Sequence, residues 1–320
     1  MDELLESLTH QTLKDFEVII VEDGSITPCK DVCDKYASIL DLHYYAKENS
    51  GPGQSRNYGA ERSNGEWLII LDSDVVLPEG YLQAVENSLQ CPLSTVNSTL
   101  VAFGGPDAAH PSFTPIQKAI SYSMTSFFTT GGIRGGKAKL DKFYPRSFNM
   151  GIRRDVYFQL GGFTKMRFGE DIDFSYRIVE AGHMPRLIPD AWVWHKRRTD
   201  FRKFFRQVYN SGIARINLEK RHPGTMKLVH LLPTIFTLGV IGLLLITPFF
   251  PLACVPIILY SLLICIDSSI ENRSLWVGLL SIPAAFVQLM GYGFGFIESW
   301  WKRCVLKQDE FTAFEKNFYS

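Results

Sequence analysis

Cysteine is scarce in this sequence: there are six among 320 residues, and none has the paired spacing of a metal site. A disulfide scaffold is therefore excluded. Neither sign of charge is in excess, because 33 Lys and Arg balance 33 Asp and Glu. This balance argues against nucleic acid as the main partner. Disorder is excluded as well, since 46% of the residues are hydrophobic and 13% are aromatic.

Charged residues are missing from two long stretches near the C-terminus. No Asp, Glu, Lys or Arg occurs in Leu228–Ile266, a run of 39 residues, or in Ser274–Ile297, a run of 24. A membrane-spanning helix needs about 20 apolar residues. The first run is therefore expected to form two short spans that join at Thr247–Pro251, and the second to form one span. A buried helical hairpin in a large soluble core is the alternative.

Basic residues gather just before the first apolar run. Residues 195–221 contain nine Lys and Arg against two acidic residues. Basic residues beside a span mark its cytoplasmic side and attract anionic lipid headgroups. The spacing of Phe201, Phe204 and Val208 favours an amphipathic helix on the bilayer, with a solvated basic face as the alternative. Residues 1–227 are therefore expected in the cytoplasm, with membrane lipids as a partner.

Three crossings would conflict with this orientation. They would place the basic residues of 302–307 on the outer side, against the positive-inside tendency. A third segment that re-enters the membrane without crossing it would remove the conflict. The glycines Gly291, Gly293 and Gly295 would suit such a segment. The sequence leaves both arrangements open.

Residues 1–195 alternate short β-branched runs with helical stretches, which is the pattern of an α/β fold. Strands are expected over Phe16–Val21, Leu42–Ala46 and Trp67–Leu71. The expected helices between and after these strands are Cys29–Ile39, Gln54–Arg62 and Pro78–Leu89. The fold class that this order predicts is a mostly parallel sheet flanked by helices.

The most informative motif is Leu71-Asp72-Ser73-Asp74, at the end of a predicted buried strand. Its two carboxylates can reach one point at the C-terminal edge of the sheet, where open α/β sheets bind ligands. Two such oxygens suit a hard divalent cation that takes its remaining ligands from a diphosphate. An Asx-type turn after the strand is the alternative, and this D-x-D motif alone does not decide between them.

Three further polar sites have both a functional and a structural interpretation. Glu22 and Asp23 end an earlier strand, which fits a nucleoside contact or an ordinary tight turn. Glu170 and Asp171 open a predicted helix, where carboxylates also stabilise the helix dipole. His195 follows a strand-like run, and a single histidine there is more often a hydrogen-bonded core residue than a ligand.

Taken in order, the motifs resemble those of the family 2 glycosyltransferases, inverting enzymes of the GT-A fold. The matching segments are Val18–Ser25, Gly51–Gly59, Gly65–Asp74, Phe148–Arg153, Gly161–Phe163, Gly169–Arg177 and Val193–His195. Each segment is weak evidence alone, but their order and spacing together are specific. The resemblance covers roughly residues 2–215 and implies a GT-A-like domain followed by C-terminal transmembrane helices.

The resemblance also implies a role for each candidate site residue. The residues implied for the nucleotide sugar are Glu22, Asp23, Arg56 and Asp72. A cation, Mn²⁺ or Mg²⁺, would be held by Asp74, Asp72 and His195, a ligand set that both ions tolerate. Asp171 aligns with the catalytic base, and Glu170 would orient the acceptor or the base.

The family usually begins with a strand whose polar end helps to hold the base of the nucleotide. Met1–Leu8 match the helix that follows this strand, so we expect an in-frame extension of about 10–20 residues ahead of Met1. The expected divisions of the chain are a GT-A-like catalytic domain over 1–195 without its first strand, a basic juxtamembrane segment over 196–227, two or three transmembrane or re-entrant helices over 228–300, and a polar tail over 301–320.

The implied function is a metal-dependent, inverting glycosyltransferase at the cytoplasmic face of a bacterial inner membrane. It would move a sugar from a nucleotide-diphosphate donor, such as a UDP-sugar, to a lipid-linked or growing glycan acceptor. Two other functions stay open. A metal-dependent phosphoryl or nucleotidyl transferase would use Asp72 and Asp74, but it has no need for a base at Asp171 and the chain has no P-loop. A non-catalytic, nucleotide-sugar-binding membrane protein is the other.

Overall fold

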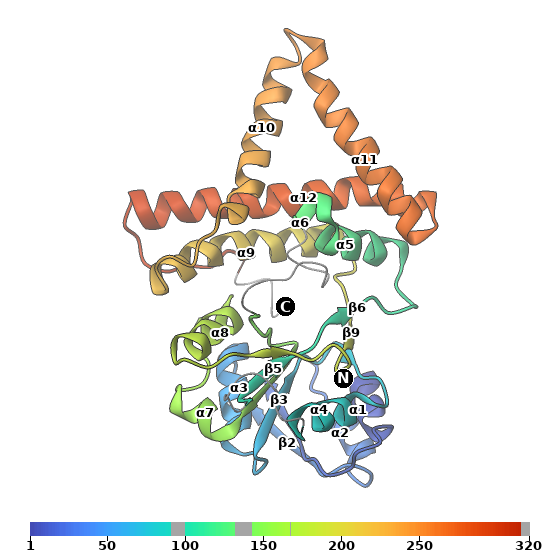
Figure 1. Cartoon of the computed structure of the whole chain (residues 1–320), viewed down its shortest axis with the longest axis vertical. Coiled ribbons are helices and arrows are strands. Elements are labelled where there is room, and N and C mark those ends of the chain that lie inside the picture. The colour runs from blue at the N-terminus through green and yellow to red at the C-terminus, as the bar shows by residue number, and fades with distance from the viewer. Residues whose placement is uncertain (91–99, 132–142, 167, 315–320) are drawn as a thin grey trace. The chain divides into compact units, whose positions relative to one another are not determined.

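The computed structural model describes residues 1–90, 100–131, 143–166 and 168–314 (Figure 1). The chain divides into two compact units: unit 1 contains Met1–His110 and Leu140–His195, and unit 2 contains Pro111–Lys139 and Lys196–Glu315. One division between the units falls between His195 and Lys196. Residues 111–131 group with the C-terminal helices. Of the expected polar tail, residues 315–320 lie outside the described residues.

Unit 1 alternates helices and short strands along the chain. Its helices are α1 (Asp2–Thr9), α2 (Lys30–Tyr36), α3 (Pro52–Glu61), α4 (Tyr81–Gln90), α7 (Arg154–Gln159) and α8 (Glu170–Glu180). Its strands are β1 (Val18–Asp23), β2 (Leu42–Lys47), β3 (Trp67–Leu71), β4 (Val75–Val76), β5 (Ala102–Gly104), β6 (Asp107–Ala108), β7 (Asn149–Arg153), β8 (Arg186–Leu187) and β9 (Val193–His195). The predicted α/β class is thus confirmed.

The strands pair in both directions. β1 and β2 run parallel, β3, β7, β5 and β8 follow one another in a second sheet, and β4, β9 and β6 form a third. Among the described strands, the pairs β1–β2, β5–β8 and β6–β9 are parallel, whereas β3–β7, β5–β7 and β4–β9 are antiparallel. The expectation of a mostly parallel sheet is therefore wrong, because β7 inserts between β3 and β5 in the opposite direction.

Several expected elements have different boundaries in the structure. α2 ends at Tyr36 and not at Ile39, and α3 starts at Pro52 and not at Gln54. β1 starts two residues later than predicted and includes Glu22 and Asp23, which were expected in the turn after it. α4 starts at Tyr81 and not at Pro78, because Pro78 and the two residues after it form a turn. The Tyr81 N–H closes this turn by donating to the carbonyl of Pro78 (3.0 Å).

The core of unit 1 explains why α8 begins where it does. Phe174 and Ile178, four residues apart on one face of α8, are fully buried in a cluster with Met150 and Ile152 of β7. Residues at this spacing lie on one side of a helix. Burial of each such side chain stabilises the fold by about 1.5–3 kcal/mol. The packing therefore fixes α8 against β7 and sets the position of its acidic first turn.

Unit 2 is helical. Its α-helices are α5 (Pro115–Thr125), α6 (Phe127–Thr130), α9 (Phe201–Arg221), α10 (Leu232–Ile246), α11 (Val255–Asn272) and α12 (Leu275–Trp300). Short turns of other helix types occur at η1 (Leu228–His230), η2 (Pro251–Cys254) and η3 (Trp301–Val305). Three stretches are long and apolar enough to cross a membrane: Leu228–Ile246, Pro251–Asn272 and Leu275–Val305. This agrees with the expected membrane association.

The glycines of α12 are points of close helix contact. α12 is continuous through Gly291, Gly293 and Gly295, so these residues do not break it as a re-entrant turn would. A Cβ atom on Gly295 would lie 2.0 Å from the carbonyl oxygen of Tyr209 in α9, and one on Gly293 would lie 2.1 Å from Oγ1 of Thr237 in α10. Small residues of this kind allow helix backbones to approach closely.

Gly295→Ala should therefore lower the stability of the chain. The added methyl group would overlap the Tyr209 backbone, and overpacking of this kind costs about 1–3 kcal/mol. Gly242→Ala in α10 is the matched control, because a Cβ atom there has no neighbour within 4 Å. Removal of a helical glycine at an open position should stabilise the helix by about 0.5–1 kcal/mol. Thermal unfolding of the detergent-solubilised chain, followed by circular dichroism, measures both; equal effects would contradict the packing.

Candidate active site

Two aspartates and a histidine lie together at the end of β3. Asp72 and Asp74 occupy the turn between β3 and β4, which the Val75 N–H closes by donating to the Asp72 carbonyl (3.3 Å). β4 pairs antiparallel with β9, and Val75 is opposite His195. The pairing brings one ligand atom from each of Asp72, Asp74 and His195 within 4.8 Å of one another. Three residues that were predicted to share a cation site therefore meet.

The His195 ring is held in place from a second motif. Phe148 stacks on the imidazole with ring centroids 4.8 Å apart. The next residue, Asn149, donates from Nδ2 to the carbonyl of Ala191 (2.8 Å) and accepts from the Tyr81 hydroxyl (2.6 Å). These contacts fix the chain that leads into β9. They explain the Phe148–Arg153 motif as a support for the histidine.

The cluster fits a divalent cation. His195 Nε2 lies 3.3 Å from Asp74 Oδ1, while Nδ1 of the same ring is buried and has no hydrogen-bond partner among the described residues. Buried polar atoms without a partner are rare. Two carboxylates with one imidazole are a donor set that Mn²⁺ accepts well and that Mg²⁺ tolerates. Asp72, Asp74 and His195 are thus the described residues that could hold such an ion.

Arg56 connects the aspartate turn to α8. Its guanidinium donates to Asp72 Oδ1 (2.9 Å) and to Glu170 Oε1 (2.8 Å), and it lies 5.4 Å from the centroid of the Phe163 ring. Burial opposes the charged form, but the two carboxylates outweigh it and raise the pKa of Arg56. The predicted site residues Arg56, Asp72 and Glu170 therefore form one ion-pair network.

Asp23 supports the start of α3. Its carboxylate accepts from the backbone N–H groups of Ser50 and Gly51 (both 2.9 Å) and from Nζ of Lys47. Burial opposes ionisation, but the Lys47 ammonium and the N–H donors lower the pKa of Asp23. Asp23 thus anchors the loop that leads into the helix carrying Arg56.

Glu22 points into a different loop. It is buried, and its carboxylate accepts from the Ser25 hydroxyl and from the Cys29 N–H (2.8 Å). Burial opposes ionisation here as well, yet the hydrogen bonds lower the pKa of Glu22. Its contacts hold the loop between β1 and α2. The structure brings it to none of the other predicted site residues.

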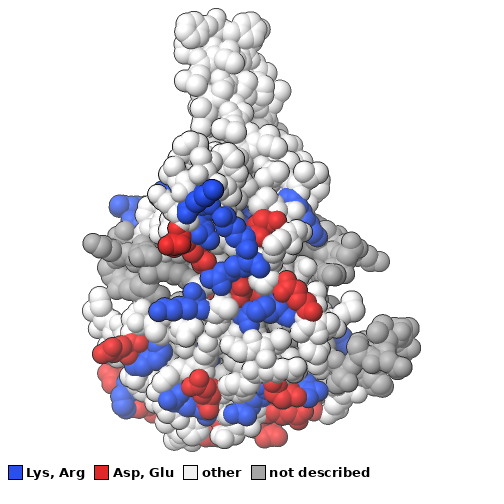
Figure 2. Space-filling model, turned by 90° about the vertical axis from the view of Figure 1, so that its left-hand side faces the viewer, with Lys and Arg blue, Asp and Glu red and all other residues white. Residues whose placement is uncertain are grey.

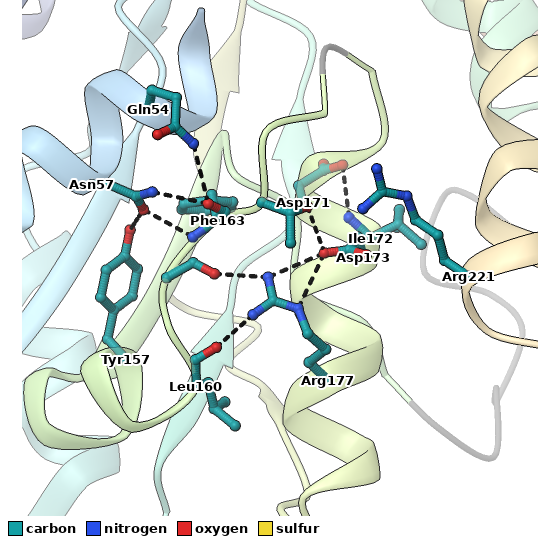
Figure 3. A network of polar contacts seen from close by, with 12 residues as sticks. Gln54, Asn57, Tyr157, Leu160, Phe163, Asp171, Ile172, Asp173, Arg177 and Arg221 are labelled. Carbon is teal, nitrogen blue, oxygen red and sulfur yellow. Dashed lines mark hydrogen bonds and ion pairs between the residues drawn. The ribbon is translucent and has the colours of Figure 1, made fainter. Parts of the chain in front are cut away.

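The loop before α8 is tied to α3 by amide side chains. Asn57 donates from Nδ2 to the Phe163 carbonyl (2.9 Å), and its Oδ1 accepts from the Phe163 N–H (2.8 Å) and from the Tyr157 hydroxyl (2.5 Å) (Figure 3). On α8, Asp173 accepts from Nε of Arg177 (3.1 Å), whose guanidinium also donates to the Leu160 carbonyl (2.7 Å). The Gly161–Phe163 motif is therefore a rigid connection between α3 and α8.

Glu170 and Asp171 open α8 as predicted, and both are buried. Burial first, and then the neighbouring Asp171 carboxylate, raise the pKa of Glu170 to about 7 against the opposing effect of Arg56. Asp171 accepts from Nε of Arg146 (2.6 Å) and from the Ile172 N–H (2.9 Å). Burial would raise the pKa of Asp171, but the Arg146 guanidinium outweighs it and lowers that pKa. The adjacent carboxyls thus differ in protonation near neutral pH.

Three residues of this site were not predicted. Lys47 lies opposite Asp23 in the parallel register of β1 and β2, so a correct strand pairing could have indicated it. Phe148 belongs to a recognised motif but carried no predicted role. Arg146, the partner of Asp171, lies 25 residues earlier in the chain. No pattern in the sequence points to that tertiary contact.

The fold is that of the GT-A-type glycosyltransferases. It aligns with a mannosyltransferase from Pyrobaculum calidifontis, solved in complex with GDP-Man and Mn²⁺, at a TM-score of 0.60 and 17% identity over 90% of this chain and 82% of that one. Residues 1–157 match the model of glycosyl transferase family 2, so this part of the chain belongs to that family. The resemblance inferred from the motifs is confirmed.

Two relatives support the same assignment. The chain is 28% identical to the pre-mycofactocin glycosyltransferase of Mycobacterium tuberculosis over 66% of this chain and 44% of that protein. It is also 28% identical to an uncharacterized glycosyltransferase of Haemophilus influenzae over 55% of this chain and 56% of the other. The chain thus spans about half the length of these relatives.

The raised pKa of Glu170 predicts a pH dependence of stability. Its folded pKa is about 7, above the ordinary value of 4.5, so the folded chain binds this proton more tightly than the unfolded chain. The stability that this proton adds to the folded chain is fully present below about pH 4.5 and is lost as the pH rises through about 7. The loss amounts to roughly 1–3 kcal/mol. Asp171, with a lowered pKa, titrates below this range.

Glu170→Gln removes the titration. Relative to this variant, the wild-type chain should lose melting temperature between pH 5 and pH 8, as measured by thermal unfolding of both proteins at each pH. The difference in melting temperature between the two proteins at each pH cancels the effect of all other titrating groups. A difference between the two proteins that stays constant from pH 5 to pH 8 would show that Glu170 is ionised throughout.

Proposed function

We propose that the chain is a metal-dependent, inverting glycosyltransferase that uses a nucleotide-diphosphate sugar. The observation that carries this proposal is the single network that joins the Asp72–Asp74–His195 cluster, through Arg56, to the carboxylates of α8. A cation site for the departing diphosphate and a carboxylate that can act as the base are the two parts that this reaction uses. The mannosyltransferase of similar fold, solved with GDP-Man and Mn²⁺, supports a donor and an ion of these classes.

Donor binding follows from the positions of the polar groups. A bound cation supplies positive charge that stabilises the departing diphosphate. Asp72, Asp74 and His195 would hold it, and Asp23 keeps the loop before α3 in place. Arg56 is paired with two carboxylates, so its task in this proposal is to position Asp72 and Glu170. Glu22, through its contacts with Ser25 and Cys29, supports the loop between β1 and α2.

Asp171 is the proposed base. Its lowered pKa keeps it ionised at neutral pH, so Oδ2 can accept the proton of an acceptor hydroxyl. The hydroxyl oxygen then forms a bond to the anomeric carbon while the bond from that carbon to the diphosphate breaks, which inverts the centre. In this proposal the hydroxyl displaces Arg146 from Oδ2, and the loss of that ion pair makes the carboxylate more basic. Glu170 orients the acceptor.

The acceptor and the location are inferred from unit 2. Three apolar helical stretches suggest that the chain resides at a membrane, and the nine basic residues before them favour a cytoplasmic catalytic unit. A lipid-linked or growing glycan acceptor at the cytoplasmic face of a bacterial inner membrane suits this arrangement. The family of residues 1–157 favours sugar transfer over the phosphoryl or nucleotidyl transfer that the aspartates alone leave open.

Loss of Asp74 should weaken metal binding. Asp74→Asn removes a proposed ligand, and because even outer-shell partners change metal affinity by about 10–100-fold, a loss of about tenfold or more is expected. His195→Ala should weaken binding less, since the carboxylates remain. Binding of Mn²⁺ by the full chain is measured by electron paramagnetic resonance. Asp155→Asn is the control, because this exposed carboxylate pairs with Arg153 and the Val156 N–H at the start of α7, away from the cluster. Unchanged affinity in Asp74→Asn would contradict the site.

Asp171→Asn tests the base. The amide keeps the shape but cannot accept the proton, so turnover should fall by about 10²-fold or more while donor affinity changes little. Glu170→Gln is the internal comparison and should alter acceptor use more than the chemical step. If Asp171 only stabilises the start of α8, the variant should instead lose about 0.3–1 kcal/mol of stability and keep its turnover. Turnover of labelled nucleotide sugars, with the melting temperature of each variant, separates these results.

A further inference from the structure

α12 packs lengthwise against α9. Successive residues of the two helices meet in the same order, which shows that the helices run parallel. Ser299 donates to the Ile213 carbonyl (3.2 Å), and Nε of Arg303, just beyond α12, donates to Asn217 (3.1 Å). Closer to the middle of α12, the glycines at 291 and 295 face α9. The C-terminal half of α12 and the residues after it are therefore fixed to α9.

α9 is too charged to cross a membrane. Its charged residues occur in the first turns, the middle and the last turn: Arg202, Lys203, Arg206, Arg215, Glu219, Lys220 and Arg221. Each Lys or Arg at the centre of a spanning helix costs about 2.5–3.5 kcal/mol on the insertion scale. Because α12 lies beside α9, it cannot cross without α9. The hydropathy of α12 alone is therefore a misleading guide to its topology.

The glycines of α12 contact α10 and α11 near the base of the hairpin that these two helices form. Gly293 packs on Pro233 and Thr237 at the start of α10, whereas Gly278 packs on Cys265 and Ser269 toward the end of α11. The two contact points are 15 positions apart on α12. Figure 1 shows α12 running across the foot of the hairpin, with α10 and α11 rising from it to a shared tip. A third spanning helix would instead run alongside α10 and α11 toward the tip of the hairpin.

The hairpin itself carries an apolar, charge-free surface. Leu238, Leu245, Leu259 and Leu262 are each more than half exposed, and at the tip Phe249 is 89% exposed. Figure 2 shows no charged side chain on the visible face of the projecting arms. At 1.5 Å per residue, the 15 residues of α10 extend about 22 Å, against a hydrocarbon core of about 30 Å. An exposed apolar surface of this length fits lipid chains.

The chain after α12 returns to α9. Arg221 pairs with Glu310 (2.8 Å), and Asn210 exchanges hydrogen bonds with the backbone of Ala313 (3.0 and 2.9 Å). α9, which precedes the hairpin in the sequence, and the segment that follows α12 are thus held together. This arrangement also removes the conflict with the positive-inside tendency, since the basic residues of 302–307 lie with those of α9.

We propose that only the α10–α11 hairpin enters the lipid bilayer, with both of its ends on one face, and that α12 lies along that face beside α9. The surface that contacts lipid is then the hairpin, and the membrane interface contacts the α9–α12 layer. The N-terminal unit and the C-terminus lie on the same side of the membrane. This proposal does not depend on the sugar-transfer reaction.

Protease protection of the full chain in sealed vesicles tests the topology. One epitope tag is placed before Met1 and another after Ser320, and inside-out and right-side-out vesicles are compared. Both tags should be digested in one preparation and both protected in the other. Digestion of the two tags in opposite preparations would establish an odd number of crossings and overturn the proposal.

Native Cys304, which is exposed, provides a probe without a tag. A membrane-impermeant maleimide should label it from the side on which the N-terminal tag is digested, and Cys304→Ser is the matched control for labelling of the other thiols.

The double variant Leu245→Glu/Leu259→Glu tests whether lipid covers the apolar surface of the hairpin. After an alkaline wash, several-fold less of this variant than of the wild type should remain in the membrane pellet. Unchanged retention together with loss of a dimer would indicate a second copy of the chain, and not lipid, as the occupant.

Discussion

The buried guanidinium of Arg56 is the interaction on which the candidate site depends. It binds Asp72 after β3 and Glu170 at the start of α8, two segments separated by about a hundred residues. Two acidic motifs cannot share a partly buried site unless a cation compensates their charge. A flexible ammonium could not contact both carboxylates with the fork geometry of arginine. Arg56 therefore joins the turn that carries Asp72 and Asp74 to the first turn of α8, which carries Glu170 and Asp171.

The remaining parts of the site are built outward from this ion pair. The β4–β9 pairing places His195 beside Asp74, and Phe148 keeps the imidazole in that position. Asp23 fixes the loop before α3, and Asn57 fixes the middle of this helix, which carries Arg56. Asp23, Asn57 and Asn149, all polar residues of the recognised motifs, thus hold the framework. In unit 2, glycine contacts serve the same purpose by fixing α12 against α9 and α10.

The sequence predicted local features better than long-range ones. The α/β class, the family and the apolar C-terminal helices follow from periodicity and motif order, and the structure and comparisons confirm them. The antiparallel insertion of β7 was missed, because Asn149–Arg153 contains a single β-branched residue and because a local pattern does not specify which distant segment it contacts. The contact of Arg146 with Asp171 was missed for the same reason. The roles predicted for Asp23, Asp74 and Asp171 are consistent with their positions and stay predictions.

The central claim is that the carboxylates of α8 and the cation cluster together transfer a sugar with inversion. The most direct measurement is the analysis of products formed by the full chain in lipid with labelled nucleotide sugars and Mn²⁺. Our account predicts release of a nucleoside diphosphate and a product whose anomeric configuration, determined by nuclear magnetic resonance, is opposite to that of the donor. Release of a nucleoside monophosphate, or retention of the donor configuration, would contradict it.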